Sequence, residues 1–150
     1  MLVYFDNCSL QRPLDDKSQL RVRLESEAVL AVLELCEAGE IRLGSSEVLL
    51  FEISRTPDPL RRIYAQEVLA RASVHAETNE EVAKLARALQ EQGIRPLDAL
   101  HLASAVHSKA DFFCTCDDKL LKRARSVETT ATRVVSPLEL IQEMDPWLSR

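Results

Sequence analysis

The fold is decided by the stretch Leu2-Val3-Tyr4-Phe5-Asp6, a short apolar run that ends in a carboxylate. A run of this length is typical of a buried strand. The stretch Phe112-Phe113-Cys114-Thr115-Cys116-Asp117 repeats the pattern of a strand followed by an acid. In open α/β sheets the carboxyl ends of parallel strands form the edge where sites are built. Asp6 and Asp117 are therefore predicted to lie at the same edge of one sheet.

Helical segments alternate with short β-rich runs along the rest of the chain. This alternation predicts the α/β class, with a parallel sheet that helices cover on both faces. The segment 7–17 is predicted to be a polar loop. The predicted strands are 2–5, 41–44, 74–75, 112–116 and 132–135, and the predicted helices are 18–39, 46–54, 60–72, 78–93, one from Pro96, 120–125 and one from Pro137.

The first long helix has a clear pattern of caps and faces. Ser18 is predicted to cap its start and Gly39 to end it. A helix at 78–93 is predicted to begin with a capping box of Thr78 and Glu81. In the first long helix the predicted apolar face is Leu20, Leu24, Ala28, Val29, Val32 and Leu35, and the predicted solvent face is Arg21, Arg23, Glu25 and Glu27.

Length and charge limit the kind of protein. A chain of 150 residues with 46% hydrophobic content fits one domain, residues 1–150. The net charge of −5 disfavours a protein that coats nucleic acid through bulk electrostatics, although it does not exclude a nuclease. The 3 glycines are too few for a dinucleotide fingerprint or a phosphate loop.

The sequence shows no targeting signal. The chain enters a strand at once, and no apolar stretch approaches the roughly 18 residues of a membrane span. We expect a cytoplasmic protein that does not associate with a membrane. The four cysteines are too few and too irregular for a disulfide framework. A zinc site is disfavoured because His101 and His107, six residues apart on a helix, point in different directions, so we expect buried thiols.

Two further acids are expected to reach the same edge of the sheet. Glu52 lies in Val48-Leu49-Leu50-Phe51-Glu52-Ile53, a segment that is apolar all round, so that the carboxylate has no obvious face in water. Asp98 follows Pro96 in the first turn of a helix. Carboxylates crowded into one pocket stay ionised only when a cation offsets their repulsion. Because hard oxygen ligands select Mg²⁺ or Mn²⁺, a metal site is predicted.

Each acid also has a purely structural explanation. Asp98 complements a helix dipole, and Asp117 can serve as an N-cap, a role for which Asp118 competes. His101 shares a helix face with Asp98. A histidine in this setting is more often a satisfied, partly buried side chain than a catalyst.

Four segments of the chain resemble the PIN-domain nucleases, which include the toxins of VapBC-type systems. They are Val3-Tyr4-Phe5-Asp6, then Ser46 with Glu52 six residues on, then Pro96-Leu97-Asp98-Ala99-Leu100-His101-Leu102-Ala103-Ser104-Ala105, then Thr115-Cys116-Asp117. The resemblance implies a three-layer α/β/α sandwich with a central, mainly parallel sheet. It also implies Mg²⁺- or Mn²⁺-dependent cleavage of single-stranded RNA.

The same resemblance assigns roles to individual residues. It places Asp6, Glu52, Asp98 and Asp117 in the catalytic acidic quartet, with Asp6, Asp98 and Asp117 as metal ligands and Thr115 as the accompanying hydroxyl. The family commonly has Ser or Asn two residues after the first acid, whereas this chain has Cys8 there. Asn7 and Ser9 on either side are the candidates for that supporting role.

Substrate and partners follow from the same interpretation. Arg12, Arg55 and the basic cluster from Lys119 to Arg125 are candidate contacts to RNA phosphates. A toxin would have an antitoxin protein as a partner, and a homodimer is expected. The segment 6–16 is similar to that of a less-studied PIN subgroup, for which a toxin role does not follow.

Other functions stay open at this point. One alternative is a PIN protein of RNA processing that is not a toxin, and another is a degenerate module that binds RNA or protein without turnover. Phosphotransfer enzymes of the haloacid dehalogenase or receiver type also place Asp at a strand end. The dehalogenase type requires a second acid two residues after the first, where this chain has Cys8. The receiver type requires paired acids near the first strand, where this chain has only Asp6.

Overall fold

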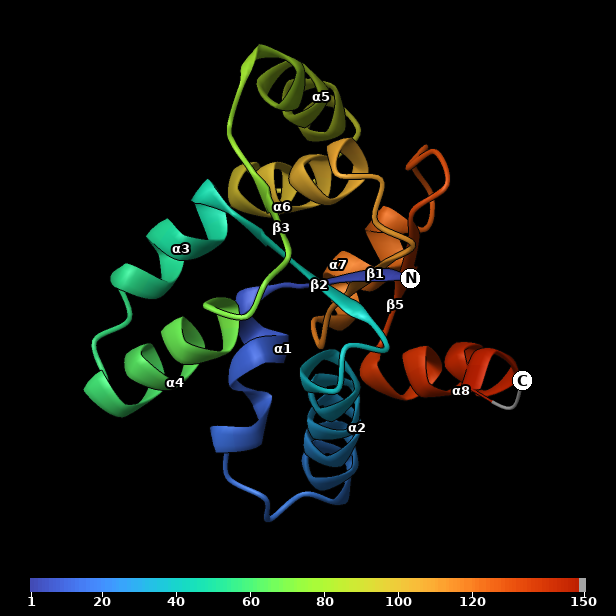
Figure 1. The fold of residues 1–150 in the computed structure, drawn as a ribbon. Helices are drawn as coiled ribbons and strands as arrows, with labels where there is room; N and C mark the ends of the chain where they lie inside the picture. Colours follow the sequence, from blue (N-terminus) through green and yellow to red (C-terminus); the bar gives the residue numbers. More distant parts are fainter. Residues whose placement is uncertain (149–150) are drawn as a thin grey trace.

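A computed structural model of the protein describes residues 1–148, with side chains for residues 1–145. Five strands form one sheet in the order β3-β2-β1-β4-β5, and every neighbouring pair is parallel (Figure 1). This confirms the predicted α/β class with a central parallel sheet. The strands are β1 (Leu2–Phe5), β2 (Arg42–Ser46), β3 (Val74–Ala76), β4 (Phe112–Cys114) and β5 (Arg133–Val135).

Helices cover both faces of the sheet. Helix α6, with α5 packed on it, lies on one face, and α2 and α8 pack together on the other (Figure 1). Among the described residues, none of the helices combines the length and apolar character that a bilayer span needs. The helices are α1 (Asn7–Gln11), the 3₁₀ turn η1 (Arg12–Leu14), α2 (Leu20–Glu37), α3 (Glu47–Ser54), α4 (Pro59–Leu69), α5 (Glu80–Glu91), α6 (Pro96–His107), α7 (Asp118–Ala124) and α8 (Pro137–Leu148).

The strand order creates a switch point between β1 and β4. The chain runs outward from β1 through β2 to β3, and then crosses to β4 on the other side of β1. Phe5 lies opposite Cys114 in the register of these two strands, so Asp6 and Thr115 are level just beyond it. The backbone N–H of Asp6 donates to the carbonyl of Cys114 at 3.2 Å. Sites in open α/β sheets are found at this kind of crevice.

The prediction of a polar loop at 7–17 is wrong for its first half. Helix α1 and the turn η1 occupy residues 7–14. The reason is local: the side chain of Asp6 accepts the backbone N–H of Ser9 and so caps a helix that begins directly after the strand. The polar side chains of this segment hid the helix, because α1 is too short to show an apolar period.

The two predicted cap assignments are also wrong. Helix α2 begins after Gln19, whose side chain makes no cap hydrogen bond, and Ser18 does not fill that role. Helix α5 is capped by Asn79, whose side chain accepts the N–H of Val82, and not by Thr78. In both cases a polar neighbour one residue away competes for the position, and the sequence signal does not separate them.

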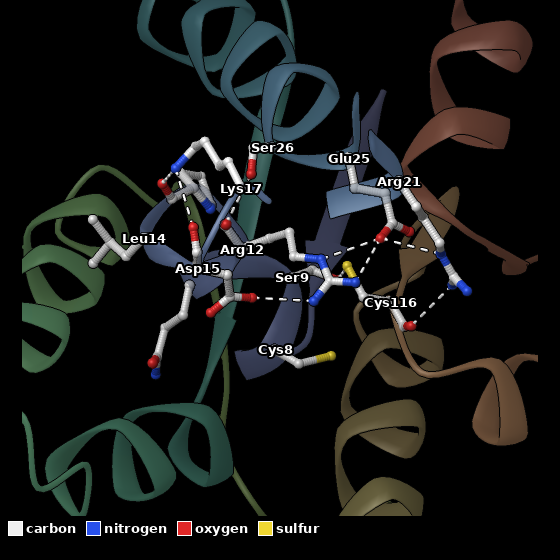
Figure 2. A network of polar contacts seen from close by, with 12 residues as sticks. Cys8, Ser9, Arg12, Leu14, Asp15, Lys17, Arg21, Glu25, Ser26 and Cys116 are labelled. Carbon is white, nitrogen blue, oxygen red and sulfur yellow. Dashed lines mark hydrogen bonds and ion pairs between the residues drawn. The ribbon is translucent and has the colours of Figure 1, made fainter. Parts of the chain in front are cut away.

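The predicted faces of α2 are wrong in its first two turns. Leu20 and Leu24 are exposed, whereas Glu25, assigned to the solvent face, is only 1% exposed. The guanidinium of Arg12 explains the reversal, because its Nε and Nη2 donate to Oε1 of Glu25 at 3.1 and 2.7 Å (Figure 2). The first turns of α2 therefore face η1 through an ion pair, and the apolar packing begins further along at Val29 and Val32.

Candidate active site

An open cleft of about 610 Å³ lies at the carboxyl edge of the sheet. All four predicted acids line it, and each comes from a different element: the ends of β1 and β4, α3 and α6. The structure thus brings together residues that are 19 to 111 positions apart in the sequence. The lining residues that matter below are Asp6, Asn7, Cys8, Asp15, Glu52, Arg55, Arg61, Asp98, His101 and Asp117.

Asp6 lies at the base of the cleft and is only 5% exposed. Its Oδ1 accepts the backbone N–H of Ser9 at 3.1 Å and the thiol of Cys8 at 3.1 Å. Burial raises the pKa of Asp6, although hydrogen bonds from Thr115, Cys8 and Ser9 counteract part of this effect. A buried carboxylate with a raised pKa is stabilised in its ionised form by a cation.

Asp98 stands in the first turn of α6, two residues after the helix-opening Pro96. Burial raises its pKa, and the negative charge of Asp6 adds to the effect, with smaller contributions from Asp117 and Glu52. His101 acts in the opposite direction. The charges of the three other acids therefore all act on Asp98, as expected for residues that line one cleft.

Asp117 has two roles in the geometry. It is the N-cap of α7, where its Oδ1 accepts the N–H groups of Lys119 and Leu120 at 2.9 and 3.2 Å. It also faces the cleft, and its own N–H donates to Thr115 Oγ1 at 3.0 Å. Helix α7 begins at Asp118, two residues before the predicted start.

Asp118 points elsewhere. Its two oxygens each lie 2.7 Å from the guanidinium of Arg21 on α2, and this ion pair lowers the pKa of Asp118. The side chain is 67% exposed and does not line the cleft. The geometry therefore separates the two neighbouring acids as the sequence pattern did, with Asp117 toward the site.

Glu52 is less enclosed than its apolar neighbours suggested. Its side chain is 26% exposed, and Leu50 and Phe51 on the outer face of α3 are exposed as well. The expectation that this segment has no face in water is wrong, because α3 packs on the rest of the protein along one side only. Glu52 Oε1 lies 3.4 Å from Nε2 of His101.

The supporting role beside Asp6 is shared in an unforeseen way. Cys8 reaches the carboxylate with its thiol, and Ser9 with its backbone N–H. The hydroxyl of Ser9 is engaged with the carbonyl of Cys114. Asn7 lines the cleft and accepts a hydrogen bond from Gln11, and Thr115 stands between Asp6 and Asp117.

The donor set suits a hard divalent cation. Among residues 1–145, no three His, Cys, Asp or Glu side chains are arranged to hold a metal ion as they stand. Mg²⁺ does not need such a cage, since it keeps several waters and uses one or two protein carboxylates. The buried Asp6 and the half-buried Asp98 supply oxygen ligands whose pKa values are raised by burial, and at Asp98 the negative charge of Asp6 adds to the effect. Asp6, Asp98 and Asp117 are the residues that would hold the ion.

Of the basic residues predicted to touch substrate, Arg12 and Lys119 lie outside the main cleft. Arg12 donates to Asp15 and Glu25, which occupy its guanidinium. Lys119 borders a small neighbouring hollow with Arg95 and Arg123, and Asp98 and Asp117 form the wall between that hollow and the main cleft.

Two arginines do line the cleft. Arg55 lies over the ring of Phe51 at 5.6 Å, and no hydrogen bond or ion pair from its guanidinium is found in the described part of the chain. Arg61 was missed by sequence reasoning, and it is held by an ion pair of 2.8 Å with Asp15. No signal in the sequence points to Arg61, because its position depends on how α4 packs on α1.

Comparison with known proteins identifies the family. A family model described as the PIN domain matches residues 19–126, about 72% of the chain. The chain belongs to the PIN-domain family. Glu52, Asp98 and Asp117 fall inside the matched segment, whereas Asp6 precedes it and is placed beside them by the fold. The resemblance noted in the sequence is thereby confirmed, and phosphotransfer enzymes of other families are excluded.

A solved structure has a similar fold. It is the crystal structure of VapBC2 from Rickettsia felis bound to a DNA fragment from their promoter, with a TM-score of 0.56. The match covers 89% of this chain and 98% of that one, at 14% sequence identity. At this identity the match shows a shared fold. No curated protein matches the sequence.

Proposed function

We propose that the protein is a metal-dependent endoribonuclease that hydrolyses phosphodiester bonds of single-stranded RNA. PIN domains are generally nucleases and typically depend on divalent metal, which supports hydrolysis by this chain. The observation that carries the proposal is the convergence of Asp6, Glu52, Asp98 and Asp117 on one open cleft. Mg²⁺ or Mn²⁺ is the proposed cofactor.

The roles of the acids follow from their surroundings. A bound divalent ion would lower the pKa of a water molecule and would stabilise the negative charge that develops on the phosphate. Asp6, Asp98 and Asp117 would hold that ion, and Glu52 would orient water. Thr115 and the thiol of Cys8 fix the orientation of the acids through Asp117 N–H and Asp6 Oδ1. No protein nucleophile is required.

Arg55 is the proposed phosphate contact within the cleft. Its guanidinium is not committed to a carboxylate, in contrast to those of Arg12 and Arg61. Lys119, with Arg95 and Arg123 in the neighbouring hollow, would receive the strand as it leaves the acids. These side chains allow a protein of net negative charge to bind an anionic substrate locally.

The test is cleavage by the purified full chain. An unstructured RNA oligonucleotide should be cut with Mg²⁺ or Mn²⁺, and EDTA should abolish the reaction. A double-stranded RNA and a single-stranded DNA of the same sequence are the matched substrates, and both should be cut more slowly. RNA binding without turnover under any of these metals would favour the alternative of a degenerate binding module.

A partner is the second part of the proposal. The similar fold belongs to a chain in the structure of a VapBC2 complex. This supports an antitoxin protein as a candidate partner of the present chain. A homodimer and a cytoplasmic location are proposed as well. Co-expression with the product of any short adjacent gene, followed by an RNA cleavage assay, separates a toxin held inactive from an RNA-processing PIN protein.

A further inference from the structure

A buried chain of polar side chains leads from the core to Glu52. The hydroxyl of Tyr4 lies 2.7 Å from Oγ of Ser46 and 2.7 Å from Nδ1 of His101. All three side chains are at most 1% exposed. On its other side the ring of His101 presents Nε2 to Oε1 of Glu52 at 3.4 Å. The chain connects β1, the start of α3, and α6, which carries Asp98.

The partners of each hydroxyl fix the direction of the hydrogen bonds. Ser46 Oγ accepts the N–H of Leu49, so its own proton must be donated to another group. Tyr4 is the acceptor in reach, and Tyr4 in turn donates to Nδ1 of His101. Burial raises the pKa of Tyr4, which keeps the phenol protonated as a donor. This arrangement leaves the ring proton of a neutral His101 on Nε2.

The reverse arrangement leaves two groups unsatisfied. If Nδ1 of His101 donated to Tyr4, either the proton of Ser46 or the proton of Tyr4 would have no acceptor among the described residues, whichever of the two hydroxyls donated to the other. The lone pair of Nε2 would also face the Glu52 carboxylate, which accepts but does not donate when ionised. Unmade hydrogen bonds of buried groups are costly, so the first arrangement is favoured.

The Nε2 atom has no other function in the fold. It is buried, and it makes no hydrogen bond of ordinary length within the described residues. Its contact with Glu52 at 3.4 Å is longer than a normal hydrogen bond, and such contacts in ligand-free sites often tighten when substrate is bound. Among the residues that the structure describes, no other side chain forms a hydrogen bond or ion pair with the Glu52 carboxylate.

We propose that His101 is a positioning residue that holds the carboxylate of Glu52 in the cleft through its Nε2–H. The proposal rests on the function proposed above, since Glu52 acts there on water. Ser46 and Tyr4 keep the proton on the correct ring nitrogen, so the core residue Tyr4 contributes to the site without facing it. His101 itself does not contact the reacting atoms.

Two substitutions at His101 distinguish the contribution of Nε2 from that of Nδ1. A glutamine places its amide N–H near the position of Nε2, whereas an asparagine reaches only the position of Nδ1. His101→Gln should keep most of the activity. His101→Asn should lower kcat by about 10- to 100-fold, as is usual for the loss of a group that orients a ligand, with little change in KM.

A double-mutant cycle distinguishes positioning from general stability. In a Glu52→Gln background, His101→Asn should cause less than about a twofold further loss, because there is no longer a carboxylate to hold. An undiminished loss in that background would overturn the proposal. The matched control is His107→Asn on the same helix, where the ring is partly exposed and lies near Glu81; kcat should not change.

If His101→Asn fails to fold, Tyr4→Phe replaces it. This change keeps the ring that stacks on Phe113 and removes the hydroxyl that sets the tautomer. It should lower kcat in the wild-type background and leave Glu52→Gln unaffected. Equal losses in both backgrounds would contradict the positioning role.

One measurement is independent of activity. The ¹⁵N chemical shifts of the His101 ring in the full chain report which nitrogen carries the proton. We expect the Nε2–H form, with an Nε2 shift that moves when Glu52 is changed to Gln. An Nδ1–H form, or no response to Glu52→Gln, would overturn the proposal even if the protein cleaves RNA. Absence of cleavage with these shifts intact would instead overturn the proposed function.

Discussion

At the scale of single residues, Asp117 combines a structural and a chemical role. Its Oδ1 caps α7, and its carboxylate also faces the cleft. The same residue type would be expected from either role alone, which is why the sequence left both explanations open. Asn caps a helix about as well as Asp but carries no charge, so a single substitution separates the two roles.

We predict that Asp117→Asn keeps the melting temperature near that of wild type and loses RNA cleavage and Mn²⁺ binding. Asp117→Ala should lose both activities and also about 1 kcal/mol of stability through the missing cap. Asp118→Ala is the control. Its ion pair with Arg21 is exposed, so activity should persist and stability should change by less than about 1 kcal/mol. An essential Asp118 with a silent Asp117 would show that the site is assigned to the wrong acid.

Substitution of Asp98 tests whether repulsion among the carboxylates of the cleft destabilises the metal-free protein. Burial and Asp6 raise its pKa, so the folded state binds the proton of Asp98 more tightly than the unfolded state does. The stabilising effect of that proton is complete below the ordinary pKa of an aspartate, and it is lost as the pH rises through the raised value. At neutral pH without metal, the ionised Asp98 therefore destabilises the fold.

We predict that Asp98→Asn raises the melting temperature of the metal-free protein at pH 7 and leaves it unchanged near pH 3. The same substitution should lower cleavage by at least about 100-fold. Thermal melts across pH, with one RNA assay, measure both effects. A residue that only complements the helix dipole would give near-normal activity and a slightly lower melting temperature at pH 7.

Arg55 is the basic side chain of the cleft without a carboxylate partner in the described residues. Arg55→Ala should raise KM for RNA by about tenfold with little change in kcat, because a charge-assisted bond to a phosphate is lost equally from ground and transition states. Arg23→Ala, an exposed arginine on α2, is the matched control and should have no effect. Equal KM values for both variants would exclude Arg55 as a contact.

At the scale of elements, one buried acid joins three segments. Glu25 on α2 receives Arg12 from η1 and lies 3.4 Å from Arg21 (Figure 2). Arg21 in turn forms an ion pair with Asp118 at the start of α7. Arg12 follows the short helix that Asp6 caps. The pair of Glu25 and Arg12 therefore fixes the helix that orients the first acid of the site.

We predict that Glu25→Ala lowers the free energy of unfolding by roughly 3 kcal/mol, because the partly buried Arg12 loses its main partner. Glu27→Ala, two residues further on the exposed face, should change it by less than about 0.5 kcal/mol. Urea denaturation gives both values. Similar small effects of the two variants would mean that the ion pair around Glu25 does not stabilise the fold.

Sequence reasoning succeeded for elements whose signal is local and periodic. The strands of the sheet, and the place of Asp6 and Asp117 beyond two of them, follow from apolar runs that end in acids. It failed for α1, which is too short to show a helical repeat of apolar residues. It also failed for Glu25, a charged residue that was assigned to the solvent face of its helix but is buried. The partner of Glu25 is Arg12, which lies in the turn η1. The burial of Glu25 therefore depends on a residue outside α2, and the sequence of α2 alone does not reveal it.

At the scale of the whole molecule, the strand order makes the site. Because β1 lies between β2 and β4, the four acids, which belong to separate elements, converge on the cleft at the carboxyl edge of the sheet. The contact between Tyr4 and His101 joins residues 97 positions apart and could not be read from the sequence. The sequence predicted which acids meet, and the fold was needed to show which side chains hold them.

The central claim is that these acids serve a metal ion in RNA hydrolysis. The most direct measurement is cleavage of an unstructured RNA by the purified protein, titrated with Mg²⁺ or Mn²⁺ and then with EDTA, beside Asp98→Asn purified in the same way. We predict metal-dependent cleavage by the wild type that EDTA abolishes and the variant lacks. Cleavage that persists in EDTA, or that Asp98→Asn retains, would contradict the account.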